Sequence, residues 1–536
     1  MIFAALAIVA VLCASSCQND ENFFSRTDQQ LFIGDDIAVA QTQYGKVRGY
    51  IMKDTYTFLG IPYGANTAGE NRFMPAQPPQ PWDGIKPALF YGACAPQSVM
   101  KYPNNVATFL DCWNYFDMGE DCLNLNVWTP GLDGKNRPVI VWFHGGGFAS
   151  GNSIEHHEYH GENFSHYCDA VFVSPNHRLN SIGFSDFSAI DPKFKDSGNV
   201  GILDLVEALK WVHNNIANFG GDPNNVTIIG QSGGGAKVCN ILAMEETKGL
   251  VHKAVALSGN ATSSMNKETA QELGKAILEE AGLKPEEIYK LQEMPYEEYM
   301  ALANKVSRSF AQTHPNIGRA GFAPVADGDH IPEGKFFQSS HTNNVPMMIC
   351  STTAEFPSAR DNAELHASSK EDVIKMFAKR VGEEKAASVY EAYAEIFPEK
   401  LPIEIYDVYT SSRNGVLTTA GLKIQQDAPV YVAWFDWQPR ILDGRLHAFH
   451  TMDIAFWFMN TDLQVSHTGG GQYPRNLSKK MAKALNNFMR TGNPNGKTGL
   501  PNWPEFTAEN GETMVLADKS YVLNNPDKKA LSLIQQ

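Results

Sequence analysis

The feature that most constrains this chain is a series of short, continuously apolar runs that alternate with helical patterns. Runs in which every residue is apolar, rather than every second one, are typical of strands buried on both faces of a parallel sheet. Helical periodicity fills the intervals between them. We therefore predict an α/β fold with a large, mostly parallel central sheet and helices on both of its faces. The runs lie at 138–143, 170–175, 225–230, 253–258, 345–350 and 430–435, and the clearest helical patterns at 203–219 and 477–490.

The order of these elements indicates one domain over residues 35–536, because no internal repeat or low-complexity linker interrupts it. A hydrophobic content of 43% fits a large core. The stretch 361–425 has a helical period without strands, so we expect it to lie over the sheet as a cap. With 44 Lys and Arg against 59 Asp and Glu, the net charge is −15, which would repel a phosphate backbone. Nucleic acid is therefore not an expected partner.

The N-terminus predicts export. Residues 1–17 form an uncharged apolar run that is too short to span a bilayer comfortably and is followed by polar sequence, although no Lys or Arg precedes it. Ala14, Ser15 and Ser16 directly before Cys17 resemble a bacterial lipoprotein processing site, which would make Cys17 a lipidated first residue. We expect a periplasmic or cell-surface lipoprotein of a bacterium, or a secreted protein, whose only membrane contact is that lipid.

A candidate nucleophile follows one of the predicted strands. Gly230-Gln231-Ser232-Gly233-Gly234 is a G-x-S-x-G pattern that leads into a helix-like run. At a sharp strand-to-helix turn the serine backbone is strained, and small residues two positions away on either side prevent clashes. The N-terminus of the following helix also favours developing negative charge beside the serine. Taken alone, the motif leaves open the alternative of a glycine-rich turn with an idle serine, which is the weaker of the two interpretations.

A second glycine-rich motif, HGGGF at 144–148, follows the strand at 138–143. Glycines after a buried strand allow backbone N–H groups to point into a cavity, as an oxyanion hole requires. The donors would be the amides of Gly146, Gly147 and Gly233. A flexible loop is the alternative interpretation, but it does not explain why both motifs occur in the expected order.

A general base and an orienting acid should follow the serine in the order serine, acid, histidine. Glu355 comes just past a predicted strand, and His450 precedes an apolar helical segment. His447 is a weaker alternative for the base, and His366 lies too close to the acid in sequence. We therefore predict Ser232, Glu355 and His450 as a catalytic triad.

Seven sequence blocks, taken in their order along the chain, are recognisable together. They are FLGIPYG at 58–64, NRFMPAQPPQPWDG at 71–84, EDCLNLNVWTP at 120–130, HGGGF at 144–148, GNVGILD at 198–204, FGGDPNNVTIIGQSGGG at 219–235 and GNPNG at 492–496. With these blocks, nearly everything after residue 40 resembles the type-B carboxylesterase family of α/β-hydrolases, which includes cholinesterases and bacterial para-nitrobenzyl esterases. The resemblance implies the α/β-hydrolase fold with helical cap insertions, and hydrolysis of a small to medium carboxylic ester through an acyl-enzyme.

The resemblance also assigns residues. It implies that Ser232 is the nucleophile, Glu355 the acid and His450 the base, and that Cys94 and Cys122 form a disulfide. The spacing of cysteines and histidines contains no zinc-type pattern, so we expect no metal and no cofactor. The cysteines left without an assigned partner, which we expect to be buried free thiols, are Cys112, Cys168, Cys239 and Cys350.

Some positions depart from the family pattern. GQSGG replaces the usual GESAG, so Gln231 removes a carboxylate beside the nucleophile, which argues against a cationic, choline-type substrate. Gly233 in place of alanine should loosen the oxyanion hole slightly. Trp113 resembles a position that lines the gorge in some members. Proteins of this fold such as neuroligins are adhesion modules that typically lose the nucleophile; this alternative is disfavoured because the chain keeps serine, acid and histidine.

Overall fold

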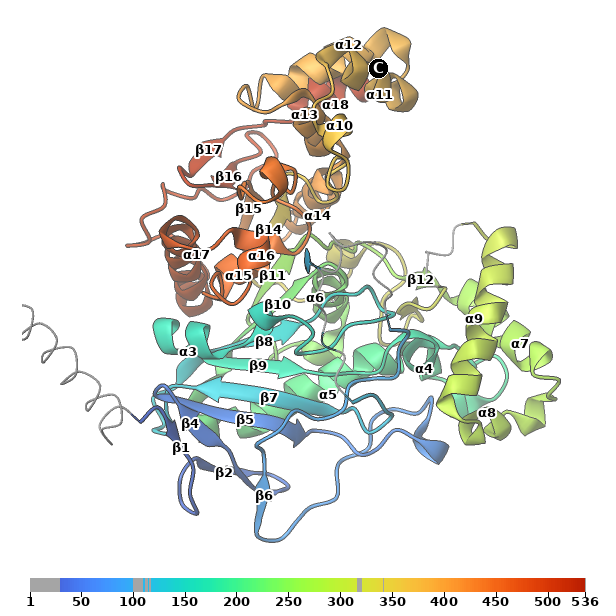
Figure 1. The fold of residues 1–536 in the computed structure, drawn as a ribbon. Helices are drawn as coiled ribbons and strands as arrows, with labels where there is room; N and C mark the ends of the chain where they lie inside the picture. The colour runs from blue at the N-terminus through green and yellow to red at the C-terminus, as the bar shows by residue number, and fades with distance from the viewer. Residues whose placement is uncertain are drawn as a thin grey trace, which may run out of the picture.

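The centre of the protein is a 12-stranded sheet (Figure 1). The computed structural model describes residues 29–99, 109, 110, 114, 117–315, 321–340 and 342–535. From β9 to β16 neighbouring strands run parallel, whereas the strands at both edges are antiparallel. The predicted large, mostly parallel sheet is therefore confirmed. In spatial order its strands are β1 (Leu31–Phe32), β4 (Tyr50–Met52), β5 (Thr55–Pro62), β7 (Asn124–Thr129), β9 (Val171–Pro175), β8 (Arg137–Phe143), β10 (Gly221–Gln231), β11 (Lys253–Leu257), β14 (Met347–Thr352), β15 (Val430–Phe435), β16 (Thr513–Leu516) and β17 (Tyr521–Leu523).

All six predicted strands are present, as β8, β9, β10, β11, β14 and β15. β14 begins two residues later than the apolar run, at Met347, because Pro346 has no N–H to donate to the ladder. Alternate residues of a strand face opposite sides of the sheet. In β8 every residue is buried, and Val141 packs into one hydrophobic core while its neighbour Trp142 packs into another. The continuous apolar runs thus reflect two cores, one on each face.

Helices cover both faces. One core includes residues of α4 (Asn180–Phe184), α5 (Val200–Asn215), α6 (Gly233–Ala243) and α14 (Arg413–Lys423). The other includes residues of α3 (Glu162–Cys168), α15 (Met452–Trp457) and α17 (Gln472–Thr491). The helix predicted at 203–219 is α5 continued by a 3₁₀ turn at Ile216–Phe219, and the one predicted at 477–490 is α17, which ends at Gly492 in the left-handed region.

Two helical groups extend the fold (Figure 1). The first consists of α7 (Lys267–Glu280), α8 (Tyr289–Glu293) and α9 (Tyr296–Thr313), and the sequence analysis did not predict it. The second contains α10 (Ala363–His366), α11 (Lys370–Val381), α12 (Glu383–Ala394) and α13 (Pro402–Thr410). Helices α11 to α13 share a third core with the C-terminal helix α18 (Lys528–Gln535). The predicted cap is therefore helical, and its core reaches the sheet through Trp434 of β15.

Smaller elements complete the fold. A three-stranded sheet in the order β2 (Val39–Thr42), β3 (Gly45–Arg48) and β6 (Ile85–Pro87) lies near the N-terminal edge of the large sheet. Strands β12 (Met265–Asn266) and β13 (Val325–Ala326) form a short parallel pair, and α16 (Val465–Thr468) is a single turn that follows α15.

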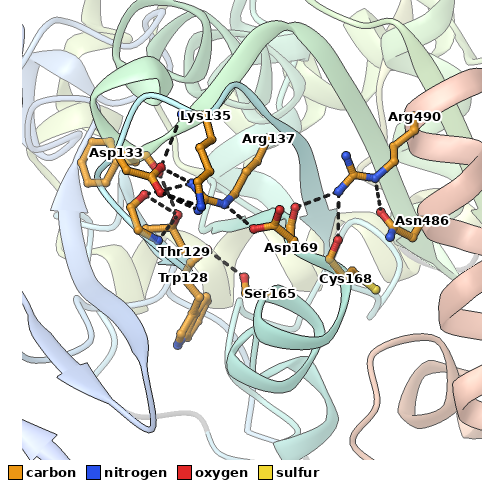
Figure 2. Close-up of polar contacts among 12 residues, drawn as sticks. Trp128, Thr129, Asp133, Lys135, Arg137, Ser165, Cys168, Asp169, Asn486 and Arg490 are labelled. Atoms are coloured by element: carbon orange, nitrogen blue, oxygen red, sulfur yellow. Dashed lines mark hydrogen bonds and ion pairs between the residues drawn. The ribbon is translucent and has the colours of Figure 1, made fainter.

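An arginine network fixes the starting end of β8 (Figure 2). Arg137 donates hydrogen bonds to Asp133 at 2.5 and 2.9 Å and to Asp169 at 2.6 Å. The Arg137 guanidinium holds the pKa of Asp133 well below its usual range. Arg490 of α17 donates to the carbonyl oxygens of Cys168 and Asp169 at 3.1 and 3.0 Å. Charge-assisted contacts therefore join β8, the turn between α3 and β9, and α17.

The disulfide that the resemblance implies between Cys94 and Cys122 is not present: both side chains are buried, and their sulfur atoms are not bonded to each other. Burial raises the pKa of Cys94 to about 12 and that of Cys122 well above its usual value, so the thiolate needed for oxidation is disfavoured. Cys168, Cys239 and Cys350 are buried free thiols, as expected.

Three of the residues singled out from the sequence, Cys17, Cys112 and Trp113, lie outside the described residues, as does the whole apolar run 1–17. Within the part of the chain that the structure describes, no helix is long and apolar enough to cross a membrane.

Candidate active site

Ser232 occupies the sharp turn between β10 and α6. Its backbone has φ 56° and ψ −122°, a strained conformation for a residue with a side chain, and its N–H donates to the carbonyl of Leu257 at 2.8 Å. A Cβ added to Gly230 would lie 2.3 Å from the carbonyl group of Gly234, and one added to Gly234 would lie 2.0 Å from the carbonyl oxygen of Phe143. The turn therefore needs both glycines, as the motif predicts.

The HGGG loop lies directly against this turn. Gly146 and Gly147 follow β8 with φ of 76° and 64° and are exposed. A Cβ added to Gly233 would lie 2.2 Å from the carbonyl oxygen of Gly147, so backbone of the loop fills the space that alanine would need. The missing methyl group thus does not leave a gap, and the amide-bearing segments that we expected to form an oxyanion hole are in contact.

Lys237 of α6 contacts the start of the same loop. We did not predict this role from the sequence. Its side chain is fully buried, and its Nζ donates to the carbonyl oxygen of His144 at 2.9 Å. Burial lowers the pKa of Lys237 to about 7, against the opposing effect of Glu155. A lysine five residues after the nucleophile, within a mostly apolar helical run, was the available signal.

Glu355 and His450 are brought together by the loops that follow β14 and β15. Glu355 is 1% exposed, and its Oε1 accepts from the backbone N–H of Thr352 at 3.0 Å. Its Oε2 lies 2.5 Å from Nδ1 of His450, and its backbone carbonyl accepts from the His450 N–H at 2.8 Å. Because a carboxylate accepts, Nδ1 of His450 carries the proton, and Nε2 is left as a base.

Three further side chains surround the imidazole of His450. Nε2 of Gln231, the residue before Ser232, lies 3.2 Å from Nε2 of His450. The ring of Phe356 stacks on the imidazole with centroids 5.0 Å apart, and Phe356 is 72% exposed. Burial and the nearby Glu355 raise the pKa of Asp453 to about 7. Gln231 thus brings the histidine to the turn that bears Ser232.

The other candidate histidines face elsewhere. Nδ1 of His447 lies 3.2 Å from Oε1 of Glu404 in α13, and burial lowers the pKa of His447 to about 3. The ring of His366 lies 6.0 Å from that of His447. Neither contacts Glu355 among the contacts that the described residues make, so His450 is the histidine that the structure pairs with the predicted acid.

A cavity of about 700 Å³ opens beside the HGGG loop. This is within the range of sites that bind small organic molecules. Its lining combines apolar groups with a few hydroxyl and amide side chains. The residues that line it are Gly147, Phe148, Asn240, Ala261, Ser263, Ser264, Met265, Asn266, Thr269, Thr313, His314, Pro315, Gly321, Phe322, Ala323 and Pro324.

Comparison with known proteins places the chain in a family. The model of the Carboxylesterase family matches residues 36–534. The para-nitrobenzyl esterase of Bacillus subtilis (strain 168) is 31% identical over 500 residues, which cover 92% of this chain and 97% of that protein. The phenmedipham hydrolase of Pseudarthrobacter oxydans is 30% identical over 496 residues, which cover 90% of this chain and 95% of that protein.

Solved structures agree with the sequence relatives. An esterase from Clostridium hathewayi, described as able to hydrolyse aliphatic aromatic polyesters, superposes with a TM-score of 0.84 at 34% identity and covers 94% of this chain and 99% of its own. A structure of para-nitrobenzyl esterase has a TM-score of 0.74 at 30% identity and covers 92% of this chain and 99% of its own. The chain has the α/β-hydrolase fold and belongs to the carboxylesterase family.

Proposed function

We propose that the protein is a serine carboxylic-ester hydrolase in which Ser232 is the nucleophile, His450 the general base and Glu355 the orienting acid. The observation that carries this proposal is the Glu355–His450 hydrogen bond of 2.5 Å beside the strained turn that presents Ser232. Family membership and the esterase relatives support carboxylic-ester hydrolysis as the activity.

In the proposed reaction, Nε2 of His450 takes the hydroxyl proton as Ser232 attacks the ester carbonyl. Backbone amides of Gly146, Gly147 and Gly233 donate to the oxyanion of the tetrahedral intermediate. His450 then protonates the departing alcohol, and a water molecule, deprotonated by the same histidine, hydrolyses the acyl-enzyme. Glu355 holds the imidazole and balances its positive charge throughout.

The surroundings of the site favour an ester with an apolar or aromatic group. Phe356 presents an exposed ring on the face of His450, and the 700 Å³ cavity begins at the HGGG loop. The names of two relatives refer to a para-nitrobenzyl group and to aliphatic aromatic polyesters. We therefore propose small to medium esters, including aromatic ones, as substrates. Gln231 adds no negative charge for a cationic alcohol.

The direct test is release of p-nitrophenol from acetyl, butyryl, octanoyl and benzoyl esters by the purified protein and by Ser232→Ala. We expect Ser232→Ala to lower kcat by about 10³-fold or more, because residual activity would come only from binding and the oxyanion donors. Ser309→Ala, at an exposed position in α9, is the matched control and should keep parental activity.

Equal activity of Ser232→Ala and its parent would show that Ser232 is not the nucleophile. If neither cleaves these esters, a serine-directed phosphonate decides the question, because it should label the parent at Ser232 and leave Ser232→Ala unlabelled.

We also propose that residues 1–17 direct export and that Cys17 is lipidated. The support is the apolar run and the small residues before Cys17. Membrane fractions from the native bacterium or a suitable bacterial host should contain the parent but not Cys17→Ala; equal fractionation of both would refute lipidation.

A further inference from the structure

A group of buried ligand-type side chains lies outside the candidate active site. His156 and Glu158 flank the first residue of a 3₁₀ turn at His157–Tyr159, and His467 belongs to α16. One ligand atom of each lies within 4.8 Å of the others. Nδ1 of His467 is 3.4 Å from Oε2 of Glu158, and Nδ1 of His156 is 4.0 Å from Oε1. The three side chains are 4%, 0% and 0% exposed for His156, Glu158 and His467.

The carboxylate of Glu158 lacks hydrogen-bond donors. Neither of its oxygens accepts a hydrogen bond from the described residues. The ion pairs that it makes within the described part of the chain are with His156 and His467 and not with lysine or arginine. A fully buried carboxylate without donors is strongly unfavourable unless a positive charge lies against it. A cation between the carboxylate of Glu158 and the two imidazoles would therefore stabilise the buried negative charge.

The ring of His467 is held in the orientation of a ligand. Its Nε2 lies 2.8 Å from the carbonyl oxygen of Leu110 and 3.0 Å from the side-chain amide of Gln464. A carbonyl only accepts, so we assign the proton of Nε2 to the shorter contact, and the amide of Gln464 then faces Nε2 through its oxygen. In the neutral ring Nδ1 then directs its lone pair at Glu158. A backbone carbonyl that fixes the distal nitrogen in this way is the usual outer contact of a metal-bound histidine.

We propose that His156, Glu158 and His467 bind a divalent transition-metal ion, with zinc as the best fit. Zinc–ligand distances of about 2.0–2.2 Å in a tetrahedral site place ligand atoms about 3.4 Å apart. The Nδ1–Oε2 distance of 3.4 Å between His467 and Glu158 already matches, and the pair formed by His156 needs to close by less than about 1 Å. Water would complete the coordination.

An access route exists for the ion. A cavity of about 360 Å³ is lined by His156 together with His157, His160 and Glu162. An ion can therefore approach the three buried ligands from this cavity, on the side of His156. An ion held there would join the segment after the HGGG loop to α16, which comes far later in the chain. The role of the ion would therefore be structural, because it would connect the first half of the chain with its C-terminal part.

A second cluster of the same residue types provides a matched control. His366, Glu404 and His447 also converge, but the Glu404 carboxylate accepts from the backbone N–H of Leu401 and the side chain of Gln438, each at 3.0 Å. Its charge is thus already stabilised by hydrogen bonds. Glu404→Gln should leave metal binding intact, whereas Glu158→Gln should abolish it.

The experiment measures metal content after incubation of the purified full-length protein with Zn²⁺ and removal of free ion. The parent and Glu404→Gln should retain one equivalent of zinc. Glu158→Gln and His467→Gln should bind it more than about 100-fold more weakly, since even outer contacts are worth about 10–100-fold. Co²⁺ added to the parent should give the visible spectrum of a tetrahedral nitrogen–oxygen site, and Zn²⁺ should raise the Tm of the parent but not of Glu158→Gln.

Cobalt titration of the parent requires no variant to fold, so it decides the matter if the substitutions destabilise the chain. Absence of stoichiometric zinc and of a cobalt spectrum in the parent would overturn the proposal in favour of a simple ion pair with a protonated His467. Equal retention of zinc by the parent and a folded Glu158→Gln would overturn it as well.

Discussion

Gln231 is the residue that joins the turn bearing Ser232 to the imidazole of His450. Its amide Nε2 lies 3.2 Å from Nε2 of His450, where it donates to the lone pair of the neutral ring. Its Oε1 is buried and has no hydrogen-bond partner among the described residues. Rotation of the amide would present that oxygen to the imidazolium formed during the reaction. A glutamine can therefore follow both protonation states without adding charge.

Replacing this amide by a carboxylate should move the acid limb of the pH–activity profile. In Gln231→Glu a negative charge about 3 Å from His450 favours the imidazolium. More of the enzyme is then protonated and inactive at a given pH, so the limb moves to higher pH. An opposite charge at this distance shifts such an equilibrium by about 1–3 pH units. The measurement is kcat/KM for an uncharged p-nitrophenyl ester between pH 5 and 9.

Gln231→Met is the neutral control of similar size. It loses the hydrogen bond without adding charge, so kcat can fall while the limb stays within about 0.5 pH unit of the parent's. If Gln231→Glu and Gln231→Met have the same limb, the side chain at 231 does not govern protonation of His450.

Among single residues, those of the G-x-S-x-G and HGGG motifs could be predicted from the sequence, because the conformation of a short backbone segment determines their spacing. Gly230 and Gly234 are required by a turn that spans only a few residues. Lys237 and Phe356 could not be predicted in the same way. The contact of Lys237 with His144 and that of Phe356 with His450 join segments about 90 residues apart, and a single sequence carries no signal for such contacts.

Between elements, a close approach of α6 to the HGGG loop shapes the site. A methyl group at Gly233 would lie 2.2 Å from the Gly147 carbonyl oxygen and 2.4 Å from its Cα. Since these are backbone atoms, they cannot move aside as the end of a flexible side chain could. The conformation of the loop and the glycine at the start of α6 therefore depend on each other.

Gly233→Ala should displace the loop and weaken oxyanion stabilisation. We expect kcat to fall by about 10–100-fold with little change in KM, because a displacement of about 1 Å from catalytic geometry costs up to about 10² in rate. Steady-state kinetics with p-nitrophenyl butyrate measures both constants. This outcome differs from the gain that alanine would bring if the glycine only loosened the site.

Gly421→Ala in α14 is the matched control, since a Cβ there meets no atom within 4 Å. It should preserve kcat and stabilise the protein by up to about 1 kcal/mol, as alanine does in helices. A Gly233→Ala enzyme with the kinetics of Gly421→Ala would show that the loop tolerates the methyl group.

Prediction of strands succeeded where the apolar run is continuous. Such runs reflect helices on both faces of the sheet, and they made β8, β9, β10, β11, β14 and β15 visible in the sequence. Strand β7 is equally buried but contains two asparagines, which interrupt its run. Strand β4, with three half-buried residues, carries no such run. Helices α7 and α9 were also missed.

For the whole molecule, the collinear sequence blocks predicted the α/β-hydrolase fold, which the structure and the comparisons confirm. The implied pairing of Cys94 with Cys122 was wrong, since the two buried sulfur atoms are not bonded to each other. A pairing taken from relatives depends on the relative placement of two side chains, which can change while the surrounding backbone is retained. The His156, Glu158 and His467 cluster escaped prediction because one of its members lies far from the others in the chain.

The order in which the sheet is built also has a consequence for synthesis. The turn that bears Ser232 belongs to the middle of the chain, whereas His450 follows β15 and is separated from Gln231 by 219 residues. At about 5–20 residues per second, a ribosome needs about 10–45 s to add that stretch. In a nascent chain, Ser232 is therefore synthesised well before His450, the histidine proposed to activate it. Reactivity toward an ester mimic should therefore be absent from translation products that end before His450.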